Sequence, residues 1–327
     1  MTLQLTSEAP PAWGEWIEAF PGRTLYHTPH WIRAICAAYP EYVPRFLVDE
    51  EHQVLIPYVI FSKKGLRQIL SLPFGTFGGP IYAPQTEDEV LRRALRGFKK
   101  KLRGLQVLRY QLAVVNPEPR LQRLLGEVFG EPQLQQFSTY VVPLEKGFDW
   151  IWNTGYENDV RRCVRKAEKS GVTLAEETTL QGAEVLFELY RLQTKTWRIK
   201  GHSAEALWQV AQELGSQARI WVTRREGRPL TAVLTLYDPG REVRPWVSGA
   251  NEESRGVKAY HYMMNCIMKH GCDEGYALWD WGGSVGRSSV ESFKQSMAGQ
   301  PVPVIQVFKE AGWYSRLRGI SSQRQSS

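Results

Sequence analysis

The order of predicted elements in this sequence occurs twice, at a spacing of about 170 residues. In the second half, alternating apolar residues and turn residues predict three strands, and apolar spacing predicts a helix. These second-half elements are strands at 219–224 and 230–237, a Gly-containing segment at 245–256, a helix at 257–270 and a strand ending in 278–283. The matching first-half elements are strands at 45–49 and 54–61, a Gly-rich segment at 70–80, a helix at 87–103 and a strand at 106–113. This internal duplication predicts two copies of one α/β unit.

The composition agrees with two globular domains. The chain has 327 residues, 43% of them apolar, and it is rich in aromatic residues, so each half has enough apolar surface to form a core. We expect a first domain at 1–146 and a second at 147–327, the latter ending in a polar tail at 313–327. The N-terminus lacks the basic start and apolar stretch of a secretion signal, and no apolar run reaches the roughly 20 residues that span a bilayer. A cytoplasmic location is therefore expected.

Four cysteines are too few for a disulfide framework in a chain of this length. Cys266, His270 and Cys272 have a spacing that resembles a metal site, but Cys266 falls on the apolar side of a predicted helix and no second ligand pair is present. We interpret these residues as buried thiols with a histidine and expect no metal.

The net charge of +7 favours an anionic partner, and much of the positive charge lies on one predicted helix at 158–171. One side of this helix is apolar, and the other carries five cations within nine residues, namely Arg161, Arg162, Arg165, Lys166 and Lys169. Because like charges at this spacing repel one another, this face indicates an anionic ligand, although a solvated basic face is the alternative.

A second candidate feature is the segment from Val247 to Lys258. A strand ends in Ser248-Gly249-Ala250, a loop carries Arg255-Gly256, and a helix begins at Val257. Backbone N–H groups at a helix start, beside an arginine, form an anion site, and small residues at a strand end allow a substrate carbonyl to approach. Main-chain N–H groups there would hold an oxyanion, although such Gly-containing turns are more often structural.

These residues resemble the GNAT acyltransferase fold, and two tandem copies resemble the Fem-type aminoacyltransferases that build peptidoglycan cross-bridges. The segments that carry the resemblance are Leu72–Pro80, Asn158–Gly171, Ser248–Asn251 and Trp279–Gly283 followed by Phe293-Lys294. The resemblance implies an α/β (α+β) fold of two tandem GNAT-like domains, each a twisted mixed sheet flanked by helices.

The resemblance also implies roles for individual residues. Lys294 would stabilise charge on the transferring ester, and Asp280 would orient the acceptor amine or neighbouring donors. The arginines Arg161, Arg162 and Arg165 would face the phosphates of a nucleotide-linked or tRNA substrate. The acceptor cleft of the first unit would be lined by Phe74, Gly75, Thr76, Phe77 and Gly78. The remaining substrate-binding residues would be Ser248, Gly249, Asn251, Arg255, Gly256, Lys258 and Tyr260. The alternative for Asp280 is a satisfied buried carboxylate, and for Lys294 an ordinary surface lysine.

Two departures bear on the donor and on the chemistry. Lys258 and Tyr260 stand where acetyl-CoA-binding GNAT enzymes have small residues, so their side chains would obstruct a pyrophosphate. Asn116-Pro117 replaces the Asp-Pro that often ends the last strand of the first unit, and a neutral amide cannot act as a general base.

The expected function is transfer of an acyl or aminoacyl group to an amine of a cell-envelope, peptidoglycan-type precursor. The donor is an aminoacyl-tRNA or an acyl-CoA, with no tightly bound cofactor. The expected partners are an anionic nucleotide-linked or small-molecule substrate, with tRNA and the inner membrane surface as further possibilities. Two alternatives stay open: an acyl-CoA-dependent N-acetyltransferase acting on a sugar or small-molecule amine, and a non-catalytic nucleotide- or nucleic-acid-binding module.

Overall fold

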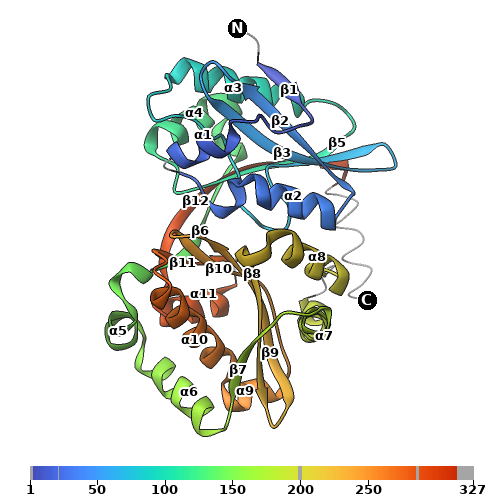
Figure 1. Ribbon diagram of the computed structural model, residues 1–327. Helices are drawn as coiled ribbons and strands as arrows, with labels where there is room; N and C mark the ends of the chain where they lie inside the picture. The colour runs from blue at the N-terminus through green and yellow to red at the C-terminus, as the bar shows by residue number, and fades with distance from the viewer. Residues whose placement is uncertain (1–2, 21, 198–200, 285–286, 315–327) are drawn as a thin grey trace. The chain divides into compact units, whose positions relative to one another are not determined.

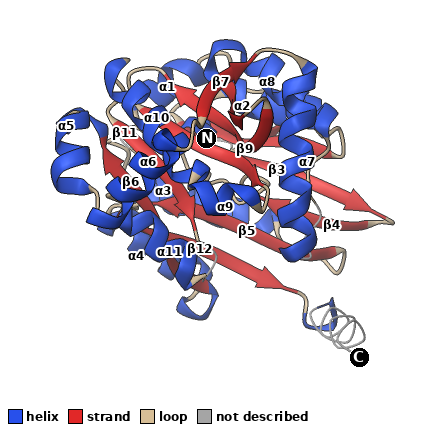
Figure 2. Cartoon of the chain, turned by 90° about the horizontal axis from the view of Figure 1, so that it is seen from below, coloured by secondary structure: helices blue, strands red, loops and turns tan. Residues whose placement is uncertain are grey.

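The computed structural model describes residues 3–20, 22–197, 201–284 and 287–314. It divides into two compact units, one made of Met1–Phe137 with Pro303–Ser327 and the other of Ser138–Val302 (Figure 1). Figure 2 shows helices (blue) and strands (red) throughout the chain, which confirms the predicted mixed fold.

The sheet has twelve strands, of which the first unit carries six in the order β1-β2-β3-β4-β5-β12. Only β4 and β5 run parallel, and every other neighbouring pair among these six strands is antiparallel. Its strands are β1 (Gln4–Thr6), β2 (Tyr42–Asp49), β3 (Val54–Lys63), β4 (Leu66–Leu70), β5 (Val107–Val115) and β12 (Gln300–Glu310). Its main helices are α1 (Trp13–Ala19), α2 (Pro29–Ala38), α3 (Asp88–Lys101) and α4 (Pro119–Phe129).

The second unit has the same plan, with strand order β6-β11-β10-β9-β8-β7 and only β10 and β11 parallel. Its strands are β6 (Leu134–Pro143), β7 (Thr173–Glu177), β8 (Ala218–Arg225), β9 (Arg228–Asp238), β10 (Glu242–Ala250) and β11 (Leu278–Gly283). Its helices are α5 (Phe148–Trp150), a π-helix at Ile151–Gly155, α6 (Asn158–Lys169), α7 (Leu180–Trp197), α8 (Ala204–Leu214), α9 (Glu253–Val257), α10 (Ala259–Asp273) and α11 (Ser288–Ser296).

The two series correspond element by element, from β1 and β7 at their starts to β6 and β12 at their ends. The predicted duplication is thus seen in the topology, although the short strands β1, β4 and β7, the helix α11 and the last strand β12 were not predicted. The final strand of each series pairs with a strand of the other series. The strand β6, which ends the first series, pairs with β11, and β12, which ends the second, pairs with β5.

This exchange changes the division of the chain. The expected boundary follows residue 146, whereas the compact units divide between Phe137 and Ser138, and the residues from Pro303 onward belong to the first unit. The physical reason is that β12 forms its ladder with β5, from Val304 opposite Val115 to Glu310 opposite Arg109. The expected polar tail lies outside the described residues except for its first two positions, Trp313 and Tyr314.

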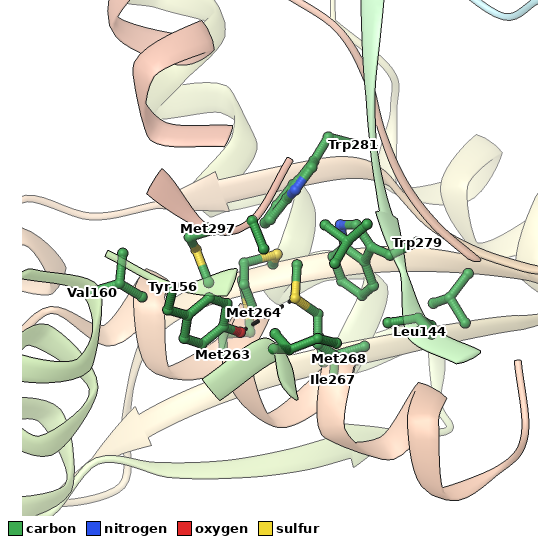
Figure 3. Close-up of a cluster of buried hydrophobic side chains, with 14 of the residues drawn as sticks. Leu144, Tyr156, Val160, Met263, Met264, Ile267, Met268, Trp279, Trp281 and Met297 are labelled. Carbon is green, nitrogen blue, oxygen red and sulfur yellow. Dashed lines mark hydrogen bonds between the residues drawn. The ribbon is translucent and has the colours of Figure 1, made fainter. Parts of the chain in front are cut away.

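The core of the second unit lies between its sheet and the helices α6 and α10 (Figure 3). The cluster includes four buried methionines together with Trp279, and the hydroxyl of Tyr156 donates to the sulfur of Met268 at 3.3 Å. The apolar side of α6 contributes Val160 and Val164, as its sequence predicts, and this orientation leaves most of the cations of α6 in solvent. These contacts fix the strand β11, which carries Asp280.

No helix in the described part of the chain is long and apolar enough to cross a bilayer. Within the same residues, no group of three or more His, Cys, Asp or Glu side chains is arranged to hold a metal ion.

Candidate functional site

The parallel strands β10 and β11 of the second unit pair only at their first residues and then separate. The register joins Glu242 to Leu278 and Val243 to Trp279, and it ends there. Beyond this point β10 follows β9, with a bulge between Pro245 and Val247, and β11 follows β6, with a second bulge between Asp280 and Gly283. Because bulges re-aim backbone groups and side chains, the diverging segments carry irregular, directed polar groups. We call this separation of the two strands the opening.

Lys294, on α11, is held at the bulge of β11. Its Nζ donates to the backbone carbonyls of Gly282 at 2.7 Å and Gly283 at 2.9 Å, and it lies 5.7 Å from the ring centroid of Tyr140. Only 5% of the residue is exposed, so it is not an ordinary surface lysine. Burial lowers the pKa of Lys294 to about 8, and the charge of Arg244 adds to this, while the carboxylates of Asp280 and Glu291 act in the opposite direction.

The two carbonyls use two of the three hydrogens of the Lys294 ammonium group. The third tetrahedral position of the nitrogen carries a hydrogen in the charged form and a lone pair in the neutral form. With a pKa of about 8, both forms are accessible near neutral pH. This is the property required of a residue that donates and accepts a proton during acyl transfer.

Asp280 stands at the point where β10 and β11 separate, and its carboxylate is fully engaged. Its Oδ1 accepts from the hydroxyl of Thr139 at 2.6 Å and from the N–H of Gly282 at 2.7 Å, and its Oδ2 accepts from Arg244. Arg244 is 1% exposed and also donates to Glu242 at 3.3 Å. A buried carboxylate with these partners is suited to fixing the bulge and Arg244 in place.

Aromatic side chains form a wall next to Lys294. The ring of Phe293 lies 5.5 Å from Tyr260, 5.2 Å from His261 and 5.6 Å from Trp281, measured between centroids. The hydroxyl of Tyr260 is 3.3 Å from the hydroxyl of Ser248 on β10. Burial lowers the pKa of His261 to about 4, with a smaller contribution from Lys258, so this imidazole is neutral at physiological pH. Ser248, Tyr260, Asp280 and Lys294 are thus brought to one region from β10, α10, β11 and α11.

The residues expected to hold phosphate and oxyanion on the donor side have other partners. A Cβ on Gly249 would lie 2.2 Å from the backbone nitrogen of Tyr190, so the backbone of α7, not a substrate carbonyl, occupies that side of Gly249. The side chain of Asn251 accepts from the N–H of Ser254 at 2.9 Å and donates to the carbonyl of Pro229 at 3.0 Å, which caps α9.

The turn that follows is open to solvent on one side. Arg255 and Gly256 are exposed on α9, and Lys258, half-buried, has a positive φ of 62° where α9 meets α10. The helix α10 therefore begins directly after another helical turn and without a free N-terminal loop. A pyrophosphate cradle of the kind that a Gly-rich turn provides does not fit these residues, which is consistent with the predicted obstruction by Lys258 and Tyr260.

The three arginines of α6 divide into one structural residue and two exposed ones. Arg161 donates to the carbonyls of Trp152 at 2.7 Å and Tyr156 at 2.8 Å and so caps the π-helix. Arg162 is exposed and pairs with Asp159 at 2.6 Å, and the exposed Arg165 lies 5.7 Å from the Trp152 ring centroid. The structure therefore leaves Arg162 and Arg165 accessible to an anion and commits Arg161 to the backbone.

The Gly-rich segment of the first unit is mostly buried. Phe74 has a φ of 62° and its ring packs against Tyr39 at a tilt of 50°, with ring centroids 4.5 Å apart, and Gly75 next to it has a φ of 71°. Thr76 is 1% exposed and donates to the carbonyl of Pro73 at 2.8 Å. Phe77 and Gly78 are buried as well. Of these residues only Phe74 and Gly75 lie where a ligand of the first unit has access.

Sequence reasoning missed four members of the site: Thr139, Glu242, Arg244 and Phe293 as a wall residue. The Gly-containing segment was predicted to begin at residue 245, so the buried Glu-Val-Arg pattern at the start of the strand Glu242–Ala250 was not assigned to any element. Ser284 was also missed: it follows Gly283, is 4% exposed, and its hydroxyl has no hydrogen-bond partner among the described residues.

Comparison with known proteins agrees with this geometry. Residues 155–295 match the family model of the acetyltransferase (GNAT) domain. FemX is similar in structure, with a TM-score of 0.68 and 11% identity over 93% of this chain and 97% of FemX. A tandem GNAT protein from the clavulanic acid biosynthesis pathway has a TM-score of 0.59 and 10% identity, with 95% of this chain and 99% of that chain covered.

A third similar structure is the C-terminal domain of an Agrobacterium fabrum protein assigned as a lysylphosphatidylglycerol synthetase. Its TM-score is 0.59 with 10% identity, and 94% of this chain and 96% of that chain are covered. A search among curated protein sequences finds no significant match. At these identities the structural likeness shows the fold, and the family match at 155–295 supports a GNAT-like acyltransferase.

Proposed function

We propose that the protein transfers an aminoacyl group from an ester donor to an amine of a cell-envelope precursor of the peptidoglycan type. The observation that carries the proposal is Lys294, which is buried, has a pKa of about 8 and is held by two carbonyls where β10 and β11 separate. The similarity to FemX over 93% of this chain supports the aminoacyl class of reaction. A small, buried proton donor suits an oxygen leaving group, which is protonated as it departs.

In the proposed reaction, the neutral acceptor amine attacks the ester carbonyl, and a C–N bond forms as the carbonyl oxygen gains charge. Beyond Val243 the strand β10 no longer pairs with β11, and we assign the stabilisation of this oxyanion to main-chain N–H groups along that edge of β10. The C–O bond then breaks, Lys294 gives its third hydrogen to the departing oxygen, and the proton lost by the attacking nitrogen restores Lys294. Asp280 acts as a positioning residue, because it fixes Arg244 and the Gly282 N–H.

Substitution of Lys294 tests the role of its hydrogen. Lys294→Met keeps the length of the side chain without the donor, and we expect turnover to fall by about two orders of magnitude. The measurement is mass-spectrometric detection of the acylated precursor, with aminoacyl-tRNA as donor and a UDP-linked muramyl peptide as acceptor. Circular dichroism establishes that the variant is folded. Lys195→Met, at an exposed position on α7, is the matched control and should leave turnover unchanged. Equal turnover in the Lys294 variant would remove this residue from the mechanism.

The family match favours a second candidate function, an N-acetyltransferase that uses acetyl-CoA and acts on a sugar or small-molecule amine. The two functions differ in the donor. Incubating the protein with each donor in turn and the same set of amines separates them. Transfer from acetyl-CoA with none from aminoacyl-tRNA would replace the first proposal by the second, and binding of the precursor without transfer from either donor would indicate a non-catalytic module.

A further inference from the structure

We propose that a basic and apolar pocket in the first unit is a contact surface for an anionic phospholipid bilayer. The pocket has a volume of about 720 Å³ and lies where α3 ends, β5 begins and β12 ends. It is separate from the opening between β10 and β11, so the inference goes beyond the proposed function. The side chains on which the argument depends are Lys99, Arg103, Leu105, Arg109, Lys309 and Trp313.

The charges that line this pocket are all positive. Four cations contribute, and no carboxylate is present among the described lining residues. Lys99 donates to the carbonyl of Val128 at 2.6 Å, while Arg103 and Lys309 are exposed. The Nε of Arg109 is buried and has no hydrogen-bond partner within the described ranges. A cationic rim of this kind attracts anionic headgroups, at about 1 kcal/mol, or about fivefold in binding, for each Lys or Arg near the bilayer surface.

Two large apolar side chains project from the same pocket. Leu105, in the loop between α3 and β5, is 96% exposed, and Trp313, just after β12, is 47% exposed. A fully exposed leucine next to a half-exposed tryptophan is unfavourable in water and gains free energy when it enters an apolar medium. Tryptophan in particular is enriched at the level of lipid headgroups, because its ring is apolar and its N–H is polar.

The combination favours a bilayer over a nucleic acid. Phosphates of RNA would satisfy Arg103, Arg109 and Lys309, but they would leave Leu105 in water, because base stacking requires aromatic partners. A bilayer surface offers anionic headgroups to the cations and acyl chains to Leu105 and Trp313 at the same time. The contact would be peripheral, with the apolar pair entering the headgroup region.

Co-sedimentation of the full-length protein with vesicles tests the proposal. We expect the protein to bind vesicles of equal parts phosphatidylglycerol and phosphatidylcholine and to remain in solution with phosphatidylcholine alone. Leu105→Asp and Lys309→Glu should each weaken binding at least about fivefold. Both side chains are on the surface, so the two variants should fold, and the two measurements are independent. Leu180→Asp, at a 43% exposed leucine of the second unit, is the matched control and should bind like the wild type.

Three outcomes would overturn the proposal. The first is a wild-type protein that does not bind the anionic vesicles. The second is binding that none of the pocket variants weakens more than Leu180→Asp does, since this would place the contact elsewhere, for example on the exposed cations of α6. The third is RNA binding by the wild type that Lys309→Glu abolishes and Leu105→Asp leaves unchanged. This result would identify a nucleic-acid surface instead of a bilayer contact. None of these readouts depends on turnover, so failure here leaves the proposed function standing.

Discussion

A lysine with two backbone carbonyls as partners is restrained in both position and ionisation. In Lys294 the carbonyls of Gly282 and Gly283 fix the direction of the third substituent of Nζ, and burial disfavours the charge. At pH 7 the ammonium form predominates, and a minor neutral fraction exists. The residue therefore releases its hydrogen more readily than a lysine with the ordinary pKa of 10.5, which is a weaker acid, and it can take the proton back near neutral pH.

The same shift predicts how stability depends on pH. Because the folded state has the lower pKa for Lys294, the unfolded chain binds more protons between about pH 8 and 10.5, and stability from this residue rises with pH over that window. Below pH 8 the buried charge costs roughly 3 kcal/mol relative to an unshifted lysine. Urea titrations at several pH values should show the wild type gaining stability relative to Lys294→Met between pH 8 and 10.5. A constant difference across that range would show that the pKa is not lowered.

At the scale of elements, helix packing determines which parts of β10 a substrate can reach. The helix α7 crosses β10 at Gly249 so closely that its backbone fills the space of a side chain. On the other face, α10 brings Tyr260 to Ser248. The accessible part of β10 is therefore the edge that faces β11, and the small residue at 249 serves the packing of α7.

Substitutions at a packed glycine and at an exposed glycine should have different effects on the free energy of unfolding. Gly249→Ala would place a Cβ 2.2 Å from the nitrogen of Tyr190 and 2.3 Å from the carbonyl carbon of Leu189, and neither backbone atom can rotate away. We expect a loss of about 3 kcal/mol in the free energy of unfolding, measured by urea titration. Gly256→Ala, with no atom within 4 Å of its Cβ, is the control and should be neutral or slightly stabilising. Equal stability of the two variants would contradict the close approach of α7.

The sequence allowed most elements of both units to be predicted, because their apolar periodicity is strong. The family resemblance named Lys294 and Asp280 as candidates through Phe293-Lys294 and the Trp-Asp-Trp strand, and both lie where β10 and β11 separate. The sequence could not reveal that Arg161 caps a π-helix or that Gly249 meets α7, since both depend on contacts between elements far apart in sequence. Arg244 was missed for the same reason: its partner Asp280 is 36 residues away.

At the scale of the whole molecule, each unit depends on a strand that ends the other series. In the first unit, β12 supplies seven paired residues opposite β5, from Val304 to Glu310. Without β12, the edge of β5 would expose unpaired backbone groups and apolar side chains such as Leu112, which is buried in the intact unit.

Truncation tests this dependence. A chain ending at Val302 lacks most of β12, and we expect it to aggregate or to lose its cooperative thermal transition. A chain ending at Tyr314 retains every described element and should match the full-length protein in melting temperature. Soluble, cooperatively folding protein from the shorter truncation would show that β12 is dispensable for the first unit.

The position of β12 also has a consequence for synthesis on the ribosome. The 165 residues of 138–302 must be translated after the body of the first unit and before its final strand. At about 5–20 residues per second, this takes roughly 8–33 s. Throughout that interval the nascent first unit carries an open sheet edge at β5, which makes it a candidate client for chaperones that shield such edges. The codons for residues 1–137 thus encode a structure that only the codons for residues 303–310 can complete.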